Sequence, residues 1–197
     1  MRSQPLPANM SMKKTLIIIA IPFLILIIFR GSIFRLTVKY NEIGSRPEIE
    51  ITNSDLLDRI EAESKNKTID LSTIVDIAKE ITTEELSFTT NNASNNPNGL
   101  INTNQANCVG YSAMFNSITN HLIRKHNLHA EIEAEHKIGH LELIGANVHR
   151  YFNSPFFKDH DFNEITNKRT GEKICVDPSV SDYFWISRVA KKKNSSR

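Results

Sequence analysis

The chain of 197 residues is long enough to form one domain with a hydrophobic core. Hydrophobic residues make up 40% of it and charged residues 23%, which is typical of a globular protein. The formal net charge of +2 is too small to indicate a nucleic-acid-binding surface, so we expect no nucleic-acid partner.

An uncharged apolar segment, TLIIIAIPFLILIIF, occupies residues 15–29. As a helix it is about 22 Å long, shorter than the roughly 30 Å hydrocarbon core of a bilayer. Lys13, Lys14 and Arg30 flank it and can reach the headgroups, so the segment fits a transmembrane anchor over residues 15–34. A cleaved signal peptide is the alternative, but the bulky residues that follow and the lack of an A-x-A pattern favour an uncleaved anchor.

Basic residues lie on both sides of the apolar segment, so the positive-inside rule gives little preference for either orientation. A single N-terminal anchor most often exports the chain that follows it. We therefore predict a single-pass membrane protein whose domain is extracytoplasmic.

The chain after the anchor begins with alternating residues that indicate short strands or extended chain. Two helices are then expected. The first covers residues 54–64, with Ser54 as its N-cap, and the second covers residues 70–86, with an apolar stripe on one face. The Asn-rich residues 89–107 are expected to form a loop.

A further helix is expected to begin at Cys108, because the apolar residues after it keep helical spacing. Residues 128–145 then alternate, which indicates one or two strands. HDFNEIT and KICVDPSV are expected to be two more strands, joined by NKRTGE with Gly171 in the turn. Helices followed by consecutive strands predict an α+β fold with an antiparallel sheet.

Three residues could together perform nucleophilic catalysis: Cys108 at a helix start, His160 at the start of one strand and Asp177 at the end of the next. The N–H groups and the dipole at a helix N-terminus favour a thiolate. An imidazole can take a thiol proton and return it to a leaving amine, while a carboxylate on its far nitrogen fixes the tautomer. Two strands joined by a turn would bring His160 and Asp177 roughly opposite each other, about 5 Å apart.

Each of these residues also has an ordinary structural explanation. A lone cysteine at a helix start is more often a small packed residue, a lone histidine is usually a surface or satisfied group, and an aspartate before proline usually makes a turn. The combination, in this order and with these neighbours, is what favours a catalytic role.

Three blocks, NCVGYSAMF, HDFNEI and ICVDPSVSDYF, resemble those of the transglutaminase-like cysteine enzymes, over about residues 70–185. The resemblance implies a transglutaminase-like or papain-like core, in which the helix that bears the cysteine packs on an antiparallel sheet. It also implies that Cys108 is the nucleophile, that His160 is the base and acid, and that Asp177 orients the imidazole.

The chain departs from the family pattern in places. Phe162 stands where the family commonly has Trp, although Glu164 matches the acid of that strand. The family often has a small residue or Gly close before the cysteine, where this chain has QAN. The backbone N–H of Cys108 is a natural oxyanion donor, and the side-chain amide of Gln105 or Asn107 could be the second.

The segment GANVHRYFNSPFFKDHDF is longer and more aromatic than in the shortest members of the family. It could shape a substrate cleft, or it could be an ordinary insertion packed on the sheet. A second interpretation of the site uses His140, because an NlpC-type cysteine peptidase has its histidine on such a strand, with His149 as a possible polar partner. That interpretation leaves VDPS unexplained and is placed second.

The other histidines have no spacing typical of a metal site, and no H-E-x-x-H motif is present, so we predict no zinc, other metal or cofactor. Cys175 shares a strand face with Asp177 and is expected to be a buried strand residue. A disulfide between Cys108 and Cys175, which would silence the nucleophile, is the alternative.

These observations predict a membrane-anchored cysteine enzyme that transfers an acyl group from an amide through a thioester. A peptide or protein is the expected substrate, and hydrolysis is favoured over cross-linking. A non-catalytic binding or scaffolding module on the same fold is the second hypothesis, and the oligomeric state is left open. The predicted division of the chain is a short basic head (1–14), the anchor (15–34), a membrane-proximal segment (35–53), the transglutaminase-like domain (54–190) and a basic tail (191–197).

Overall fold

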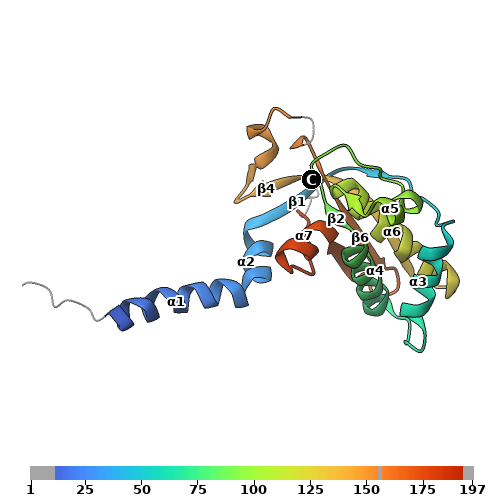
Figure 1. The fold of residues 1–197 in the computed structure, drawn as a ribbon, viewed down its shortest axis with the longest axis horizontal. Helices are drawn as coiled ribbons and strands as arrows, with labels where there is room; N and C mark the ends of the chain where they lie inside the picture. Colours follow the sequence, from blue (N-terminus) through green and yellow to red (C-terminus); the bar gives the residue numbers. More distant parts are fainter. Residues whose placement is uncertain (1–11, 155–156, 193–197) are drawn as a thin grey trace, which may run out of the picture.

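The computed structural model describes residues 12–154 and 157–192 and has an α+β architecture, in which helices pack on an antiparallel sheet (Figure 1). The main sheet has the order β1-β4-β6-β7, and each of these strands is antiparallel to its neighbour. Its strands are β1 (Val38–Arg46), β4 (Ile132–Leu143), β6 (His160–Asn167) and β7 (Lys173–Val176), with the short β5 (Ala146–Asn147) paired to the end of β4. The predicted fold class and antiparallel sheet are confirmed.

The N-terminal helix α1 (Met12–Ile28) extends away from the sheet and is followed by α2 (Arg30–Thr37) (Figure 1). No single helix in the described part of the chain is long and apolar enough to cross a membrane. The pair Ala20–Ile28 and Arg30–Thr37 passes by length and composition, but it is bent by 73°. Two helices with a bend between them are therefore observed in the region where one anchor helix over residues 15–34 was expected.

The bend is fixed by contacts of Arg30, the first residue of α2. Its guanidinium donates to the carbonyl of Ile27 in α1 and to the carbonyls of Phe184 and Trp185 near the end of the chain. These contacts hold the charged side chain of Arg30 against the domain, so the apolar helix α1 does not continue past Arg30.

The helices α3 (Ser54–Ser64) and α4 (Leu71–Glu85) lie where the apolar periodicity predicts them. The expected N-cap of α3 is wrong by one residue, because the side chain of Asn53, not Ser54, accepts the N–H of Leu56. Asp70 caps α4 in the same way. The apolar face of α4 packs on α6 (Cys108–Lys125), and α6 packs on β4 and β6 to form the main core.

The Asn-rich segment is more ordered than the expected loop. It contains the short helix α5 (Pro97–Thr103) and the strand β3 (Gln105–Ala106), which pairs in parallel with β2 (Ser87–Phe88). Asn96 caps the start of α5, and Asn104 follows its end with a φ of 54°, in the left-handed region that Asn tolerates. The asparagines that indicated a loop therefore begin and end a helix.

The last described residues join the two edges of the sheet. In the segment 189–192, one N–H donates to the carbonyl of Cys175 on β7, and two further backbone hydrogen bonds connect it to Tyr40 on β1. The ammonium of Lys191 lies 2.8 Å from the buried carboxylate of Glu164. The enclosed side of the sheet holds a second small core of Tyr40, Phe162, Cys175 and Val189.

Two predicted segments are thus built into the fold. The membrane-proximal segment 35–53 supplies the edge strand β1, and the tail predicted over 191–197 begins with two lysines that bind glutamates of the sheet. Alternation in β1 was visible in the sequence, but its partner strand lies about a hundred residues away, beyond what a local pattern can identify. Residues 193–197 and the first eleven residues of the head lie outside the described residues.

Candidate active site

Cys108 is the first residue of α6, as its sequence position predicted. The side-chain oxygen of Asn107 caps the helix by accepting the N–H groups of Val109 and Gly110. The N–H of Cys108 itself, at the first helical position, lacks an intrahelical acceptor and is not one of those bound by the cap. The thiol is buried, with 7% of the residue exposed, and lies at the positive end of a long helix.

His160 and Asp177 are brought together by the β6–β7 hairpin and the turn into α7 (Pro178–Phe184). The Nε2 of His160 donates to the Oδ2 of Asp177 over 2.6 Å. The strands pair Asn163 with Val176, so the same register places Asp177 beside Phe162 and His160 diagonally across from it. The two residues are thus offset by two positions, and both side chains lie on one face and meet, in agreement with the prediction that they lie roughly opposite each other.

The thiol of Cys108 lies beside the imidazole of His160, and the two residues line the same pocket. Because Asp177 occupies Nε2, the nitrogen left for the thiol is Nδ1. The structure thus brings together the three residues expected to act together, Cys108, His160 and Asp177, with the thiol next to His160 and His160 hydrogen-bonded to Asp177.

The carboxylate of Asp177 is held by more donors than the sequence suggested. Its Oδ2 also accepts the hydroxyl of Tyr40 at 2.7 Å. Its Oδ1 accepts the hydroxyl of Ser179 at 2.7 Å and the N–H of Val180 at 3.1 Å, which makes Asp177 the N-cap of α7. Ser179 is part of the VDPS block, whereas Tyr40 is contributed by the distant strand β1, and no local signal identified it.

The surroundings of His160 and Asp177 favour the charged form of both. Burial opposes a charged imidazole, but the charge of Asp177 and the hydrogen bonds to Asp177 and Cys108 together raise the pKa of His160 well above 6.5. Burial also opposes a charged Asp177, but the charge of His160 and the hydrogen bonds from His160, Tyr40 and Ser179 lower its pKa below 3.8. The site therefore stabilises the carboxylate of Asp177 and the imidazolium that forms when His160 takes up a proton.

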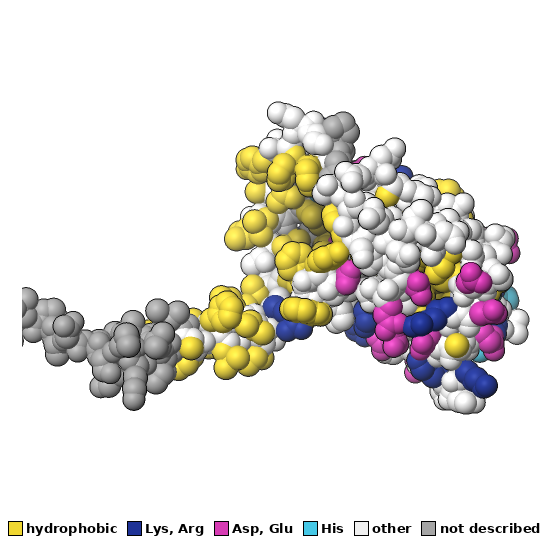
Figure 2. All heavy atoms as spheres, in the orientation of Figure 1, with side chains coloured by type: hydrophobic (Ala, Val, Ile, Leu, Met, Phe, Trp, Pro, Cys, Tyr) yellow, Lys and Arg dark blue, Asp and Glu magenta, His cyan; other side chains and the backbone are white. Residues whose placement is uncertain are grey.

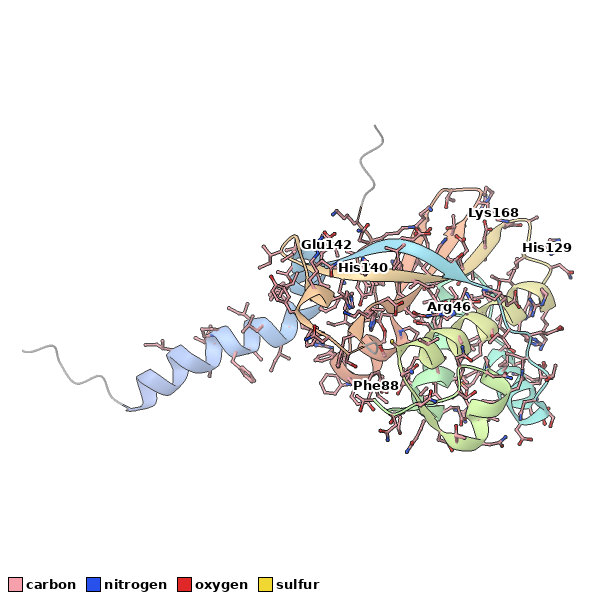
Figure 3. The ribbon with its side chains drawn as sticks, turned by 90° about the horizontal axis from the view of Figure 1, so that it is seen from above. Arg46, Phe88, His129, His140, Glu142 and Lys168 are labelled. Atoms are coloured by element: carbon pink, nitrogen blue, oxygen red, sulfur yellow. The ribbon has the colours of Figure 1, made fainter. Side chains whose placement is uncertain are left out.

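A pocket of about 240 Å³ opens beside Cys108 and His160. Most of its wall is apolar, and Asp159 is the one carboxylate among the described residues that line it. The apolar lining consists of Phe88 (labelled in Figure 3), Leu141, Val148, Phe152 and Phe157. Such a pocket fits an apolar side chain or acyl group.

Most of that wall comes from the aromatic segment between β4 and β6. This segment contains β5 and the 3-10 helix η1 (Val148–Tyr151), and it leads past residues 155–156, which lie outside the described residues. Five residues of the lining belong to this segment, as expected if it shapes a cleft.

His149, also in this segment, is a further polar group of the pocket. Its Nδ1–H donates to the carbonyl of Phe157 over 2.7 Å, which leaves Nε2 as an acceptor. That Nε2 is buried and has no hydrogen-bond partner among the described residues. Burial and the nearby charges of His160 and His140 lower the pKa of His149, and the Phe157 carbonyl opposes them only in part, so its ring is neutral.

The side chains of Asn107 and Gln105, which were considered as oxyanion donors, have different surroundings. The amide oxygen of Asn107 is used by the helix cap, and Gln105 is an exposed residue of the strand β3. The backbone N–H of Cys108 keeps the position of an oxyanion donor, because the cap binds only the next two N–H groups.

The alternative histidine, His140, does not take the position of His160. Its ring lies 5.6 Å from that of His149, and it lines a separate cavity of about 570 Å³ with Asn41, Glu142 and Arg150. The imidazole that contacts the thiol is that of His160. The histidine arrangement expected for an NlpC-type site is therefore not observed.

Cys175 is a buried residue of β7, as expected, and neither cysteine forms a disulfide. Its sulfur lies 3.8 Å from the Oε2 of Glu164. Burial, together with the charge of Glu164, raises the pKa of the Cys175 thiol to about 12, so this thiol is protonated at neutral pH. Within residues 12–154 and 157–192 no group of three or more His, Cys, Asp or Glu side chains is arranged to hold a metal ion.

Comparison with known proteins identifies no matching family model, and no curated protein or solved structure is significantly similar to this chain. The likeness to transglutaminase-like enzymes therefore depends on the three sequence blocks. The arrangement of Cys108, His160 and Asp177 in space is a separate observation, and it comes from the fold of this chain alone.

Proposed function

We propose that this chain is a membrane-anchored, transglutaminase-like cysteine enzyme that transfers an acyl group from an amide through a thioester at Cys108. The observation that carries the proposal is that the Cys108 thiol lies beside His160, whose imidazole is hydrogen-bonded to the buried Asp177. A purely structural cysteine at a helix start does not need an imidazole beside its sulfur or a carboxylate behind that imidazole.

In the first half of the reaction, the thiol proton moves to Nδ1 of His160 and the sulfur attacks the carbonyl carbon of the substrate. The N–H of Cys108 binds the oxyanion that develops. The C–N bond then breaks, and His160 returns the proton to the leaving amine. The products of this half are the free amine and a thioester on Cys108.

In the second half, an acceptor replaces the sulfur. Water gives its proton to His160 and attacks the thioester, the C–S bond breaks, and the proton returns to the thiolate. Asp177 stabilises the imidazolium each time it forms. We favour hydrolysis over cross-linking, and a peptide or protein amide as the substrate, with an apolar group beside the scissile bond in the 240 Å³ pocket.

We further propose that α1 and α2 attach the domain to a membrane, with the domain on the extracytoplasmic side. The large apolar side chains of α1 at Ile18, Ile21 and residues 23–28 are exposed by 44% or more, which is unfavourable in water. Resistance to alkaline carbonate extraction tests the attachment, and cleavage of the domain by protease added outside intact cells tests its side.

The catalytic proposal is tested with a peptide library incubated with the purified chain, alone or with a fluorescent primary amine. New carboxyl termini, detected by mass spectrometry, are expected in water, and they should disappear in Cys108→Ala and persist in the matched control Cys175→Ala. Incorporation of the amine without new carboxyl termini would instead indicate cross-linking.

The binding-module hypothesis makes a different prediction for the same chain. Alkylation of Cys108 at neutral pH should be faster than that of a free thiol and should slow in His160→Ala if the site is catalytic. A rate equal to that of a free thiol, unchanged by His160→Ala, would contradict an activated nucleophile. Loss of activity in His140→Ala with retention in His160→Ala would favour the NlpC-type mechanism instead.

A further inference from the structure

Exposed large apolar side chains are confined to a few segments of the described chain. They lie in residues 18–43, in residues 143–157 between β4 and β6, and in residues 183–185 at the end of α7. The helices α3, α4, α5 and α6 expose none. Figure 2 shows apolar side chains over α1 and over the side of the domain nearest to it, whereas charged side chains gather over the far side.

Two of these segments are tied directly to α2, at the base of α1. The N–H of Ile144 donates to the carbonyl of Thr37, the last residue of α2, over 2.8 Å. At the other end of α2, Arg30 donates to the carbonyl of Trp185, and its guanidinium lies 5.8 Å from the centre of the Trp185 ring. The exposed apolar groups therefore meet around the base of the apolar helix.

We propose that this face of the domain lies on the lipid bilayer into which α1 inserts. The face is defined by the exposed residues Ile144, Tyr151, Phe184 and Trp185, of which three are exposed by 74% or more. Tyr and Trp prefer the headgroup region of a bilayer, where their rings are apolar and their polar atoms remain hydrated. Continuity with α1 favours lipid over a protein partner, because the bilayer that surrounds α1 reaches the same surface.

The orientation has a consequence for the pocket beside Cys108. Phe152, which lines that pocket, directly follows Tyr151 in the segment placed on the lipid. The pocket therefore opens next to the membrane surface, and the substrate class is a peptide or acyl amide that is itself held at that surface. The orientation depends on the proposed membrane attachment, and the substrate class depends also on the proposed catalysis.

The chain has a single tryptophan, Trp185, so its fluorescence reports directly on this face. The full chain is reconstituted into vesicles of phosphatidylcholine with a minor share of phosphatidylglycerol, with or without lipid brominated near the headgroup end of its acyl chains. Because interfacial side chains lie about 5–10 Å into the boundary, we expect a roughly twofold loss of Trp185 fluorescence in the brominated vesicles.

Two relocated tryptophans provide matched tests in a Trp185→Phe background. Tyr151→Trp, on the proposed face, should be quenched as strongly as Trp185. His129→Trp should not be quenched, because His129 is exposed and lies at the end of the molecule opposite α1 (Figure 3). Thermal melting curves equal to that of the unaltered chain verify that both variants fold.

Several outcomes would overturn the proposal. Quenching at position 185 but not at 151 would show that the domain does not lie flat on the lipid. A blue shift of Trp185 fluorescence without bromine quenching would indicate that a protein covers this face. Failure of the chain to float with the vesicles would show that it does not bind the membrane. The same measurement on Cys108→Ala should give unchanged quenching, so a failure of the catalytic proposal is distinguishable from a failure of this one.

Discussion

The hydroxyl of Tyr40 donates a 2.7 Å hydrogen bond to the carboxylate of Asp177, and the two fully buried residues are 137 positions apart in the chain. Tyr40 reaches Asp177 from the edge strand β1, and its ring also packs edge-on against the imidazole of His160, with centroids 5.9 Å apart. Tyr40 therefore holds both Asp177 and His160 in place. These two residues in turn orient each other next to the Cys108 thiol. Tyr40 is a positioning residue, because its hydroxyl binds Asp177 and, among the described residues, makes no hydrogen bond to the reacting thiol.

Replacement of Tyr40 by Phe removes this hydroxyl but keeps the ring. We expect a loss of about 1.5–3 kcal/mol in the free energy of unfolding, because the hydrogen bond is made to a charged group. The kcat should fall about tenfold, which corresponds to about 1.4 kcal/mol, with little change in KM. Urea unfolding and steady-state kinetics measure the two effects, and Tyr151→Phe, at a residue with 78% exposure, is the control.

Replacement of Asp177 by Asn separates the catalytic role of this residue from its capping role. The Asn oxygen can still accept the N–H of Val180, so α7 should keep its cap. The NH2 group that replaces Oδ2 cannot accept the hydrogen bonds of Tyr40 and His160, so the melting temperature should fall. The amide cannot stabilise an imidazolium, so kcat should fall on the order of 10³- to 10⁴-fold. A variant with nearly full activity would contradict the assigned role of Asp177.

The shifted pKa values of His160 and Asp177 predict a pH window for stability. The pKa of His160 is raised on folding, so its contribution is complete below about 6.5 and is lost as the pH rises through the folded-state value. The pKa of Asp177 is lowered, so its contribution is present above about 3.9 and is lost as the pH falls through the folded-state value.

Urea unfolding at a series of pH values tests this window. The unaltered chain should be most stable between these two limits and should lose stability toward alkaline pH. In His160→Gln the alkaline loss should be smaller, because the neutral side chain has no pKa to shift. An identical pH profile for both proteins would rule out a charged imidazole in the folded state.

The two thiols should differ sharply in reactivity. The pKa of Cys175 is raised to about 12, so at neutral pH it has almost no thiolate, the form that reacts with iodoacetamide. We expect a brief treatment of the folded chain to modify Cys108 alone, and both cysteines to react after unfolding. Peptide mapping by mass spectrometry measures this, and equal modification of the two in the folded chain would contradict the structure.

Close packing around Gly110 predicts that the start of α6 tolerates no side chain there. A Cβ at this position would lie 2.8 Å from the Cβ of Ala106 and 3.0 Å from the carbonyl of Ser94. Gly110→Ala should therefore cost about 1–3 kcal/mol of unfolding free energy and lower activity, because the turn that bears Cys108 must shift. Gly99→Ala is the matched control, since its Cβ would meet only the hydroxyl of Ser94 at 3.9 Å.

Local patterns were sufficient for much of the fold. Apolar periodicity located α3, α4 and α6, and alternation located β4 and β6, because each signal depends on neighbours within a few residues. The same rules misjudged residues 89–107, since asparagine favours both loops and helix caps, and they missed α2, whose start is fixed by contacts of Arg30 with the distant Phe184 and Trp185.

The sequence by itself determined which side chains could perform the chemistry: a cysteine at a helix start, a histidine and an aspartate on successive strands, and an apolar N-terminal segment. Only the tertiary structure decided that His160, not His140, contacts the thiol, and that Tyr40 completes the shell of Asp177. It also decided that residues 189–192 join both edges of the sheet. The physical reason is register, because partners in a sheet are set by side-chain packing across strands far apart in the chain, which no local periodicity encodes.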